Sequence, residues 1–510
     1  MSHEMPFTVI RNGQAIPLAQ MPYLAFDKFR QEIIQSAATG QSITAFFGDA
    51  PIPNGKVHVY VVLTDSANGT LRVGRSRLDS DTFESLTPEC PQLQLFEREI
   101  AEQYGVIPEG HPWFKPVRFH SSYRPGHDAW GRPPDEKPII GVTDFYRVEG
   151  DAIHEVAVGP VHAGVIEPGH FRFQCYGEHV FHLEISLGYQ HRGAERTLVG
   201  GPHKRAIHTI ETVAGDTSIG HGTAYCELLE ALSGCEVSDR AHAIRGIALE
   251  LERLANHTGD LGALAGDVGF LPTASYCGRL RGDFLNLTAL LCGNRFGRSL
   301  LRPGGVRFNL DATRIQQSQE RLASALGDVT NAANLLFNSA TVLARFEGTG
   351  IVSQETATAL GLVGPSARAS RIERDVRQDF PTGIYRTAKL PISTWKTGDC
   401  FARAYIRWLE IQQSVSFIQK QLAALPDGPI QTESGPLQPD HLAVSLVEGW
   451  RGKICHCALT DVQGKFSRYK IVDPSFHNWM GLAMSLREQQ ISDFPLCNKS
   501  FNLSYCGHDL

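Results

Sequence analysis

Two segments in the first quarter of the chain show clear structural patterns. Lys56 to Thr64 is a run of β-branched and aromatic residues, which is typical of a β-strand. Gln94 to Tyr104 has the amphipathic spacing of a helix, and Gly105 directly after it is the residue that most often ends one. The pattern predicts a unit of short strands, loops and helix that extends to about Asp144.

From Glu155 onward the pattern changes to a hairpin followed by helices. Residues 155–159 and 171–175 read as two strands, and the Pro- and Gly-rich stretch 160–170 connects them. Ser238 is expected to cap a helix whose apolar positions follow helical spacing as far as Thr258.

Two further long helices are expected, over 311–346 and 400–422. The first has a seam of apolar residues that recur every seven positions, as in a helical bundle: Ile315, Leu322, Val329, Leu336 and Leu343. Strands are predicted at 453–459 and 466–472, followed by a short helix and an irregular tail.

A loop rich in Pro, Gly and His separates the two patterns and ends near residues 144–151. We therefore expect two domains, residues 1–145 and 151–510. The predicted fold class is α+β: a small α/β N-terminal domain, then a mainly helical-bundle domain with β-strands near its start and end.

Composition narrows the classes of function. The chain has 510 residues and a formal net charge of -6, so it lacks the basic footprint of a nucleic-acid-binding protein. No apolar run approaches the roughly 18 residues that span a bilayer. The N-terminus, Met1 to Met5, has no signal-peptide pattern. We expect a cytosolic protein whose link to a membrane comes through a partner.

The 11 cysteines include no Cys-x-x-Cys pair. Cys455 and Cys457 are the closest two, and strand alternation would place both on one face. Structural metal sites and iron–sulfur clusters commonly use four ligands, so these cysteines are interpreted as small buried hydrophobes in a reducing compartment. No disulfide is expected.

Longer motifs carry a resemblance to known families. Phe96-Glu97-Arg98-Glu99 and Glu109-Gly110-His111-Pro112 resemble the 30 kDa-type subunit of respiratory complex I. Gly159-Pro160-Val161-His162, Gly188 to Glu195 and Leu249 to His257 resemble its 49 kDa-type subunit. The same motifs are similar to the large subunit of membrane-bound nickel–iron hydrogenases of the formate hydrogenlyase and hydrogenase-4 type. The resemblance implies a hydrogenase large-subunit-like fold and a fusion of the two complex I subunits.

The nickel ligands of the hydrogenases have no counterpart in this chain. In that family two Cys-x-x-Cys pairs supply four thiolates, and soft sulfur holds both metals. The first pair falls on Ala214 and Thr217, and the best register for the second gives Ser504 and Gly507. Cys506 is one residue off, so its side chain is expected to point elsewhere. We expect no nickel and no metal ligand here, and an iron–sulfur cluster only in a partner subunit.

The complex I subunit uses the corresponding cavity for a quinone headgroup. By resemblance, His162 would hydrogen-bond the headgroup and Asp267 would poise the histidine, a pairing that can supply a proton near neutral pH. The tyrosine that complex I places on the other quinone oxygen is replaced by Gly215, and a nearby arginine by Thr212. Asp216, Thr217, Ser218 and His221 are therefore candidates for an altered headgroup site.

Four other charged residues have structural interpretations. Arg192 and Glu195 are assigned to cofactor binding through an internal ion pair or hydrogen-bond network near the cavity. Glu97 and Glu99 are expected to support contact between the two halves of the chain or with a neighbouring subunit.

These observations lead to one leading hypothesis and two alternatives. The chain is expected to be a peripheral-arm oxidoreductase subunit at the cytoplasmic face of the membrane. A small iron–sulfur subunit would supply electrons to a quinone-like acceptor between the hairpin, residues 188–221 and the C-terminal tail, and antiporter-like and quinone-channel-like membrane subunits would translocate ions. The alternatives are a nickel–iron hydrogenase large subunit and a catalytically silent coupling scaffold. The description NADH dehydrogenase-like refers only to the family, because the sequence contains no NAD-binding motif.

Overall fold

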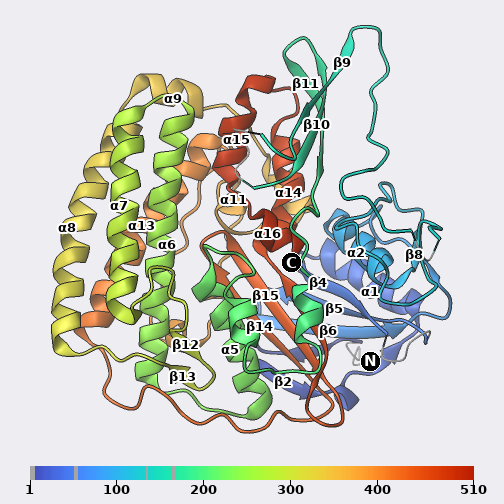
Figure 1. Ribbon diagram of the computed structural model, residues 1–510, viewed down its shortest axis with the longest axis horizontal. Coiled ribbons are helices and arrows are strands. Elements are labelled where there is room, and N and C mark those ends of the chain that lie inside the picture. The colour runs from blue at the N-terminus through green and yellow to red at the C-terminus, as the bar shows by residue number, and fades with distance from the viewer. Residues whose placement is uncertain (1–5, 51–54, 134–135, 163–166) are drawn as a thin grey trace.

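The computed structural model describes residues 6–50, 55–133, 136–162 and 167–510. Figure 1 shows long helices on one side of the molecule and the N-terminal α/β unit on the other, with strands of the C-terminal half between them. The predicted α+β class is confirmed.

The N-terminal unit is built on a sheet with the strand order β1-β6-β5-β4, and β3 pairs with β6 in parallel. The predicted strand at 56–64 and the helix at 94–104 are confirmed, and Gly105 ends that helix in the left-handed conformation. The elements are β1 (Thr8–Ile10), β3 (Tyr23–Leu24), α1 (Phe26–Ala38), β4 (Ser42–Asp49), β5 (His58–Asp65), β6 (Thr70–Arg77), β7 (Thr82–Glu84), α2 (Gln94–Tyr104) and β8 (Ile107–Glu109).

A second sheet joins the two halves of the chain. Its order is β16-β15-β14-β2, so β2 (Gln14–Pro17), from the N-terminus, pairs with β14 (His441–Gly449). The other two strands are β15 (Gly452–Thr460) and β16 (Phe466–Val472).

Both faces of β14 are buried because the strand lies between two hydrophobic cores. Leu442 and Val444 point into the N-terminal core, whereas Ala443 and Val447 point into the core of the helical half. Cys455 and Cys457 both face the N-terminal core with their sulfurs 3.5 Å apart, as strand alternation predicts.

The predicted hairpin forms, with a further strand beside it. β9 (Ile153–Val158) and β10 (His170–Tyr176) are antiparallel, and β11 (His179–Ser186) extends this sheet. Residues 163–166, within the predicted 160–170 connection, lie outside the described residues.

The long helices form a bundle against the central sheet. Ser238 caps α6 by accepting a hydrogen bond from the Ala241 amide, and Leu322, Val329 and Leu336 of the seam are buried, as predicted. The long helices are α5 (Ser218–Ser233), α6 (Asp239–Asp267), α7 (Leu271–Cys292), α8 (Ala312–Phe337) and α13 (Cys400–Ala423).

Two details of the helical prediction are wrong. The expected helix 311–346 breaks at Asn338 and Ser339, and α9 (Ala340–Phe346) continues it at a new phase that buries Val342 instead of Leu343. The expected irregular tail is helical, because Ser504 caps a last short helix. The tail elements are α14 (Pro474–Ser485), α15 (Phe494–Phe501) and α16 (Tyr505–Asp509).

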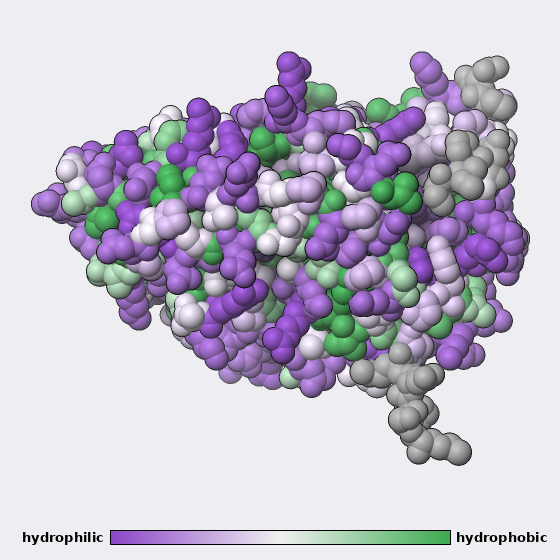
Figure 2. All heavy atoms as spheres, turned by 90° about the horizontal axis from the view of Figure 1, so that it is seen from below, coloured by the Kyte–Doolittle hydropathy of each residue, from purple (hydrophilic) through white to green (hydrophobic). Residues whose placement is uncertain are grey.

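Short elements complete the chain: α3 (Ala194–Leu198), α4 (Ala206–Ile210), β12 (Leu301–Arg302), β13 (Gly305–Val306), α10 (Gln354–Ala359), α11 (Gly364–Arg368), α12 (Val376–Asp379) and 3₁₀ turns at Leu18–Gln20, Pro91–Leu93, Gly383–Arg386 and Ile491–Asp493. Figure 2 shows a largely hydrophilic face with small, separate hydrophobic patches. Within the described ranges, no helix combines the length and the apolar run needed to cross a membrane.

Candidate functional site

The two segments that we predict to correspond to the hydrogenase ligand pairs lie side by side. Arg192 joins them, because its guanidinium donates to the carbonyl oxygens of Thr212 (2.6 Å), Val213 (3.0 Å) and Cys506 (3.0 Å). Arg192 therefore holds the segment before α5 against the C-terminal tail.

The first pair of positions has become part of the core. Ala214 and Thr217 are buried, and the Thr217 hydroxyl lies 3.1 Å from the indole nitrogen of Trp450, which donates to it. The Arg451 guanidinium forms a two-pronged ion pair with the Asp216 carboxylate, with N–O distances of 2.6 and 2.7 Å. Burial would raise the pKa of Asp216, but the charge and hydrogen bonds of Arg451 hold it below its usual value.

The second pair of positions cannot regain a ligand by a simple exchange. The Ser504 hydroxyl accepts a hydrogen bond from the Gly507 amide, so it serves as a helix cap. A Cβ atom on Gly507 would lie 2.6 Å from the carboxyl carbon of Asp473. The Asp473 carboxylate therefore fills the space next to Gly507 that a side chain would need.

Asp473 is fixed by a chain of buried hydrogen bonds. Its Oδ2 lies 3.0 Å from Nε2 of His221, whose Nδ1 lies 3.1 Å from Nε2 of His456. His456 Nδ1 is 2.8 Å from the Tyr469 hydroxyl. His221, predicted as a headgroup candidate, is thus fully buried and supports Asp473.

The prediction for Cys506 is wrong. Its thiol lies near the first segment: the sulfur is 3.3 Å from the Ser504 hydroxyl, and the Gly215 backbone amide acts to lower the pKa of the thiol. Burial and the neighbouring Glu167 carboxyl raise the pKa of this thiol. The four ligand positions therefore offer a methyl group, two hydroxyls already used in hydrogen bonds and no side chain, beside a single thiol. This donor set does not fit a centre that needs four soft thiolates.

A polar cavity of about 460 Å³ lies beside these segments. It is bordered by the base of the β9–β10 hairpin, by α6 and α7, and by the C-terminal tail. The lining residues that carry charge are Glu167, Asp216, Asp260, Arg281, Arg451 and Lys499. Its volume is within the range of small-molecule sites, roughly 300–1,000 Å³.

The structure places the two predicted proton-handling residues at different points near this region. His162 is exposed at the hairpin, next to the undescribed residues 163–166. Asp267 ends α6 with its side chain in contact with solvent. Partial desolvation by the surrounding protein nevertheless raises the pKa of its carboxyl to about 6, although the Lys499 charge lowers it. Asp267 is not among the residues that line the cavity, but its carboxyl is within electrostatic reach of Lys499, which does line it.

Glu195 and Arg192 are not partners. The Glu195 carboxylate accepts from Arg468 (2.9 Å), from the Ile471 amide (3.0 Å) and pairs with Lys470 (3.0 Å). The predicted ion pair between them is therefore wrong, whereas each residue does take part in a hydrogen-bond network.

The two glutamates predicted to join the halves have different roles. Glu99 of α2 pairs with Lys470 of β16 at 2.6 Å and with Arg118, so it does connect the halves. Glu97 instead accepts hydrogen bonds from Ser85 and Thr87 inside the N-terminal unit, so it does not form the expected contact between the halves.

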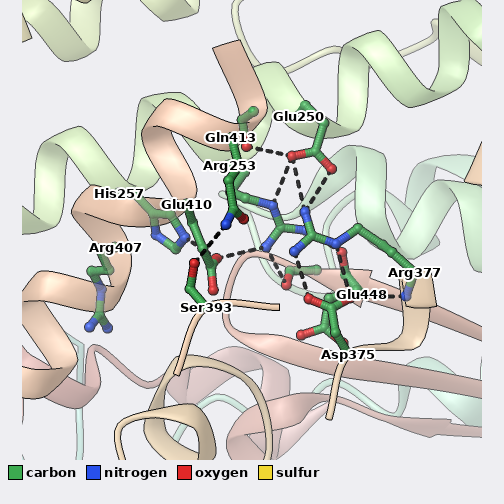
Figure 3. Close-up of polar contacts among 12 residues, drawn as sticks. Glu250, Arg253, His257, Asp375, Arg377, Ser393, Arg407, Glu410, Gln413 and Glu448 are labelled. Carbon is green, nitrogen blue, oxygen red and sulfur yellow. Dashed lines mark hydrogen bonds and ion pairs between the residues drawn. The ribbon is translucent and has the colours of Figure 1, made fainter. Parts of the chain in front are cut away.

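A second buried cluster of charges lies toward the N-terminal end of α6 from the cavity (Figure 3). Arg368 donates to Glu410 (2.7 Å) and Glu448 (2.8 Å), and Arg377 pairs with both Asp375 and Glu250. We call this the closed network. Its members are Glu250, Arg253, His257, Arg368, Asp375, Arg377, Glu410 and Glu448. The sequence motifs contain several of these residues, but nothing in their spacing identified them as one cluster.

Comparison with known proteins defines the class and then the family. The class is that of large redox-complex subunits: residues 267–441 match the family described as the 49 Kd subunit of respiratory-chain NADH dehydrogenase, and residues 32–130 match its 30 Kd subunit. Hydrogenase-4 component G of Escherichia coli is 30% identical over 91% of this chain and 83% of its own length.

Two other relatives also match long parts of the chain. Formate hydrogenlyase subunit 5 of Escherichia coli is 29% identical over 92% of this chain and 85% of its own length. A subunit of the NADH-quinone oxidoreductase of Clostridium beijerinckii is 31% identical over 63% of this chain and 87% of its own length. The chain belongs to the family of fused 30 kDa/49 kDa complex I subunits and related hydrogenase-4-type large subunits, and it is part of an oxidoreductase complex.

Proposed function

We propose that this chain takes electrons from a partner iron–sulfur subunit and delivers them to a quinone-like acceptor in the polar cavity. The observation that carries the proposal is the cavity itself, which lies where the two former ligand segments meet and is bordered by the hairpin and the tail. One relative is part of an NADH-quinone oxidoreductase, which supports a quinone-like acceptor.

The reaction is a two-electron reduction with proton uptake. Two electrons from the partner's cluster and two protons convert the two carbonyls of a quinone into hydroxyls. In this proposal His162 hydrogen-bonds the acceptor and Asp267, whose pKa is about 6, serves as a proton donor or relay near neutral pH. Arg192 and Asp216 position the wall of the site, and Thr217, Glu195 and His221 support it from behind.

The complex would lie at the cytoplasmic face of a membrane. The chain would bind there through antiporter-like and quinone-channel-like subunits that translocate ions. The donor chemistry of Ala214, Thr217, Ser504 and Gly507 supports a site without nickel. Metal analysis of the purified complex tests this point, because stoichiometric nickel would restore the hydrogenase alternative.

Turnover of the complex tests the acceptor site. His162→Ala and Asp267→Asn are each expected to lower quinone-dependent turnover by about 100-fold, the usual scale of a lost general acid. Both variant complexes should assemble, and Arg279→Gln, on the exposed face of α7, should match the wild type. Unchanged turnover in both variants would favour the scaffold alternative.

A further inference from the structure

Two cations at the cavity have no hydrogen-bond or ion-pair partner among the described residues. Arg281 of α7 and Lys499 of α15 both line it, and neither forms a hydrogen bond or an ion pair with any residue in the described part of the chain. Both side chains are only partly exposed. Partly buried charges are normally paired, so unpaired cations at a cavity indicate space for an anion.

The carboxylates in the same cavity are already engaged. Asp216 is held by Arg451. Asp260 accepts from Arg407 at 2.7 Å and from the Asn502 amide at 2.5 Å. These two acids therefore do not neutralise the free cations.

The remaining acids are weak competitors. Glu167 accepts a hydrogen bond from the Cys506 amide, and burial raises the pKa of its carboxyl. Asp267 lies near Lys499 without forming an ion pair in the described structure, and its pKa is about 6. A raised pKa makes each carboxyl easier to protonate than an ordinary acid, so neither is a fixed counter-charge for the two cations.

The position of Arg281 is built into the packing of two helices. A Cβ atom on Gly259 of α6 would lie 2.8 Å from Cδ and 3.2 Å from Nε of Arg281. The arginine stem therefore lies across a bare stretch of α6, and a side chain at position 259 would displace it. Such close packing distinguishes Arg281 from a mobile surface arginine.

A neutral donor completes the lining. The ring of Tyr505 is 4.9 Å from that of Trp479, and the residue is only 5% exposed. Its hydroxyl has no hydrogen-bond partner within the ranges described, although the Asn498 amide lies near it. A buried hydroxyl without a partner costs free energy unless a ligand or water satisfies it.

We propose that Arg281 and Lys499, with the Tyr505 hydroxyl, form a binding site for an anionic oxygen in this cavity. Two sources share that chemistry: a small soluble molecule with a carboxylate or phosphate group, or the oxygen of the acceptor itself when electrons arrive before protons. The second source rests on the proposed function, whereas the first does not.

Binding of inorganic phosphate to the purified complex, measured by calorimetry, is the first arm of the test. Arg281→Gln and Lys499→Gln are each expected to weaken binding by about 10-fold or more, the scale of one charged hydrogen bond. Arg279→Gln is the matched control, because Arg279 is on the same helix and pairs with Asp283 and Asp328. Gly259→Ala should weaken binding as well, and Arg281→Lys should restore part of it.

Turnover with a tail-less benzoquinone is the second arm. If the acceptor's own oxygen is the ligand, the same two charge removals lower kcat with little change in KM. If the two charge removals weaken phosphate binding and leave turnover unchanged, the ligand is a soluble oxyanion.

The proposal is overturned if the charge removals change neither phosphate binding nor turnover, or if Arg279→Gln has an equal effect. Absence of quinone turnover in every complex, wild type included, would refute the proposed function, and the phosphate arm would still decide this inference.

Discussion

The closed network and the polar cavity share helix α6 but use charge in opposite ways. In the closed network each carboxylate meets at least one guanidinium, and all eight members are at most 5% exposed. Just beyond His257 on α6, Gly259 and Asp260 border the cavity, where Arg281 and Lys499 have no protein partner in the described structure. The charges of the closed network are therefore used up by pairing, whereas the unpaired charges beside the cavity are available to a ligand.

The pKa values follow the same division. In the closed network burial would raise the pKa of Glu410, but Arg368 and His257 hold it far below its usual value. At the cavity desolvation prevails for Asp267 and Glu167, whose pKa values are raised. A group that titrates near neutral pH is useful for proton transfer, whereas a permanently ionised pair serves the fold.

The largest expected effect comes from breaking the closed network. Arg368→Met leaves Glu410 and Glu448 without their main cation, and removing one partner of a buried ion pair costs about 3–5 kcal/mol. Chemical denaturation of the variant measures this loss. Arg279→Gln, an exposed arginine, should stay within about 0.5 kcal/mol of the wild type. Similar stabilities for the two variants would show that the network is not a stabilising unit.

Adding a side chain at Gly507, a predicted ligand position, is expected to have the next largest effect. Gly507→Ala forces a Cβ atom against Asp473, which His221 fixes, and overpacking of this kind costs about 1–3 kcal/mol. The thermal midpoint should fall. The double variant Asp473→Ala/Gly507→Ala separates the clash from other causes. If the clash is the cause, the double variant should lose less stability than the sum of the losses in the two single variants.

A smaller effect is expected when the ion pair between Asp216 and Arg451 at the cavity is removed. Asp216→Asn removes the charge that faces Arg451 and should cost about 1–2 kcal/mol, discounted because the Asp216 side chain is 30% exposed. The variant frees a cation, so phosphate should bind several-fold tighter. Since the folded pKa of Asp216 is lowered, the pair's contribution is present above the ordinary aspartate pKa and is lost as pH falls through the folded value. Weaker phosphate binding would contradict this account.

The smallest effect concerns Asp267 and pH. Its pKa is raised from 3.8 to about 6 in the folded chain, so its ionisation disfavours folding as pH rises through this window. Asp267→Asn should therefore gain stability relative to wild type between pH 4 and pH 7. Paired denaturation curves at the two pH values measure the difference; an equal difference at both would argue against a raised pKa.

Part of the site could be predicted from local sequence and part could not. The hairpin, the Ser238 cap and the absence of thiolates at Ala214, Thr217, Ser504 and Gly507 were all visible along the chain. The thiol direction of Cys506 was mispredicted, because it depends on how the tail docks against the segment before α5 and not only on the turn of about 100° per residue. The boundary near residues 145–151 stays a prediction.

The sequence by itself determined what depends on near neighbours. Helix spacing, strand alternation and caps involve contacts within about four residues, and the residue type at a ligand position is a local fact. The motifs that carry the family resemblance are local features of the sequence as well.

Only the tertiary structure decided which charges meet. Asp216 finds Arg451, Gly507 finds Asp473 and Arg281 lies over Gly259, although most of these partners are far apart in the chain. The sheet that joins β2 to β14 brings such segments together, and its two buried faces link the N-terminal core to the helical core. A charged residue has many possible partners in sequence, and packing selects one of them or leaves the charge open to a ligand.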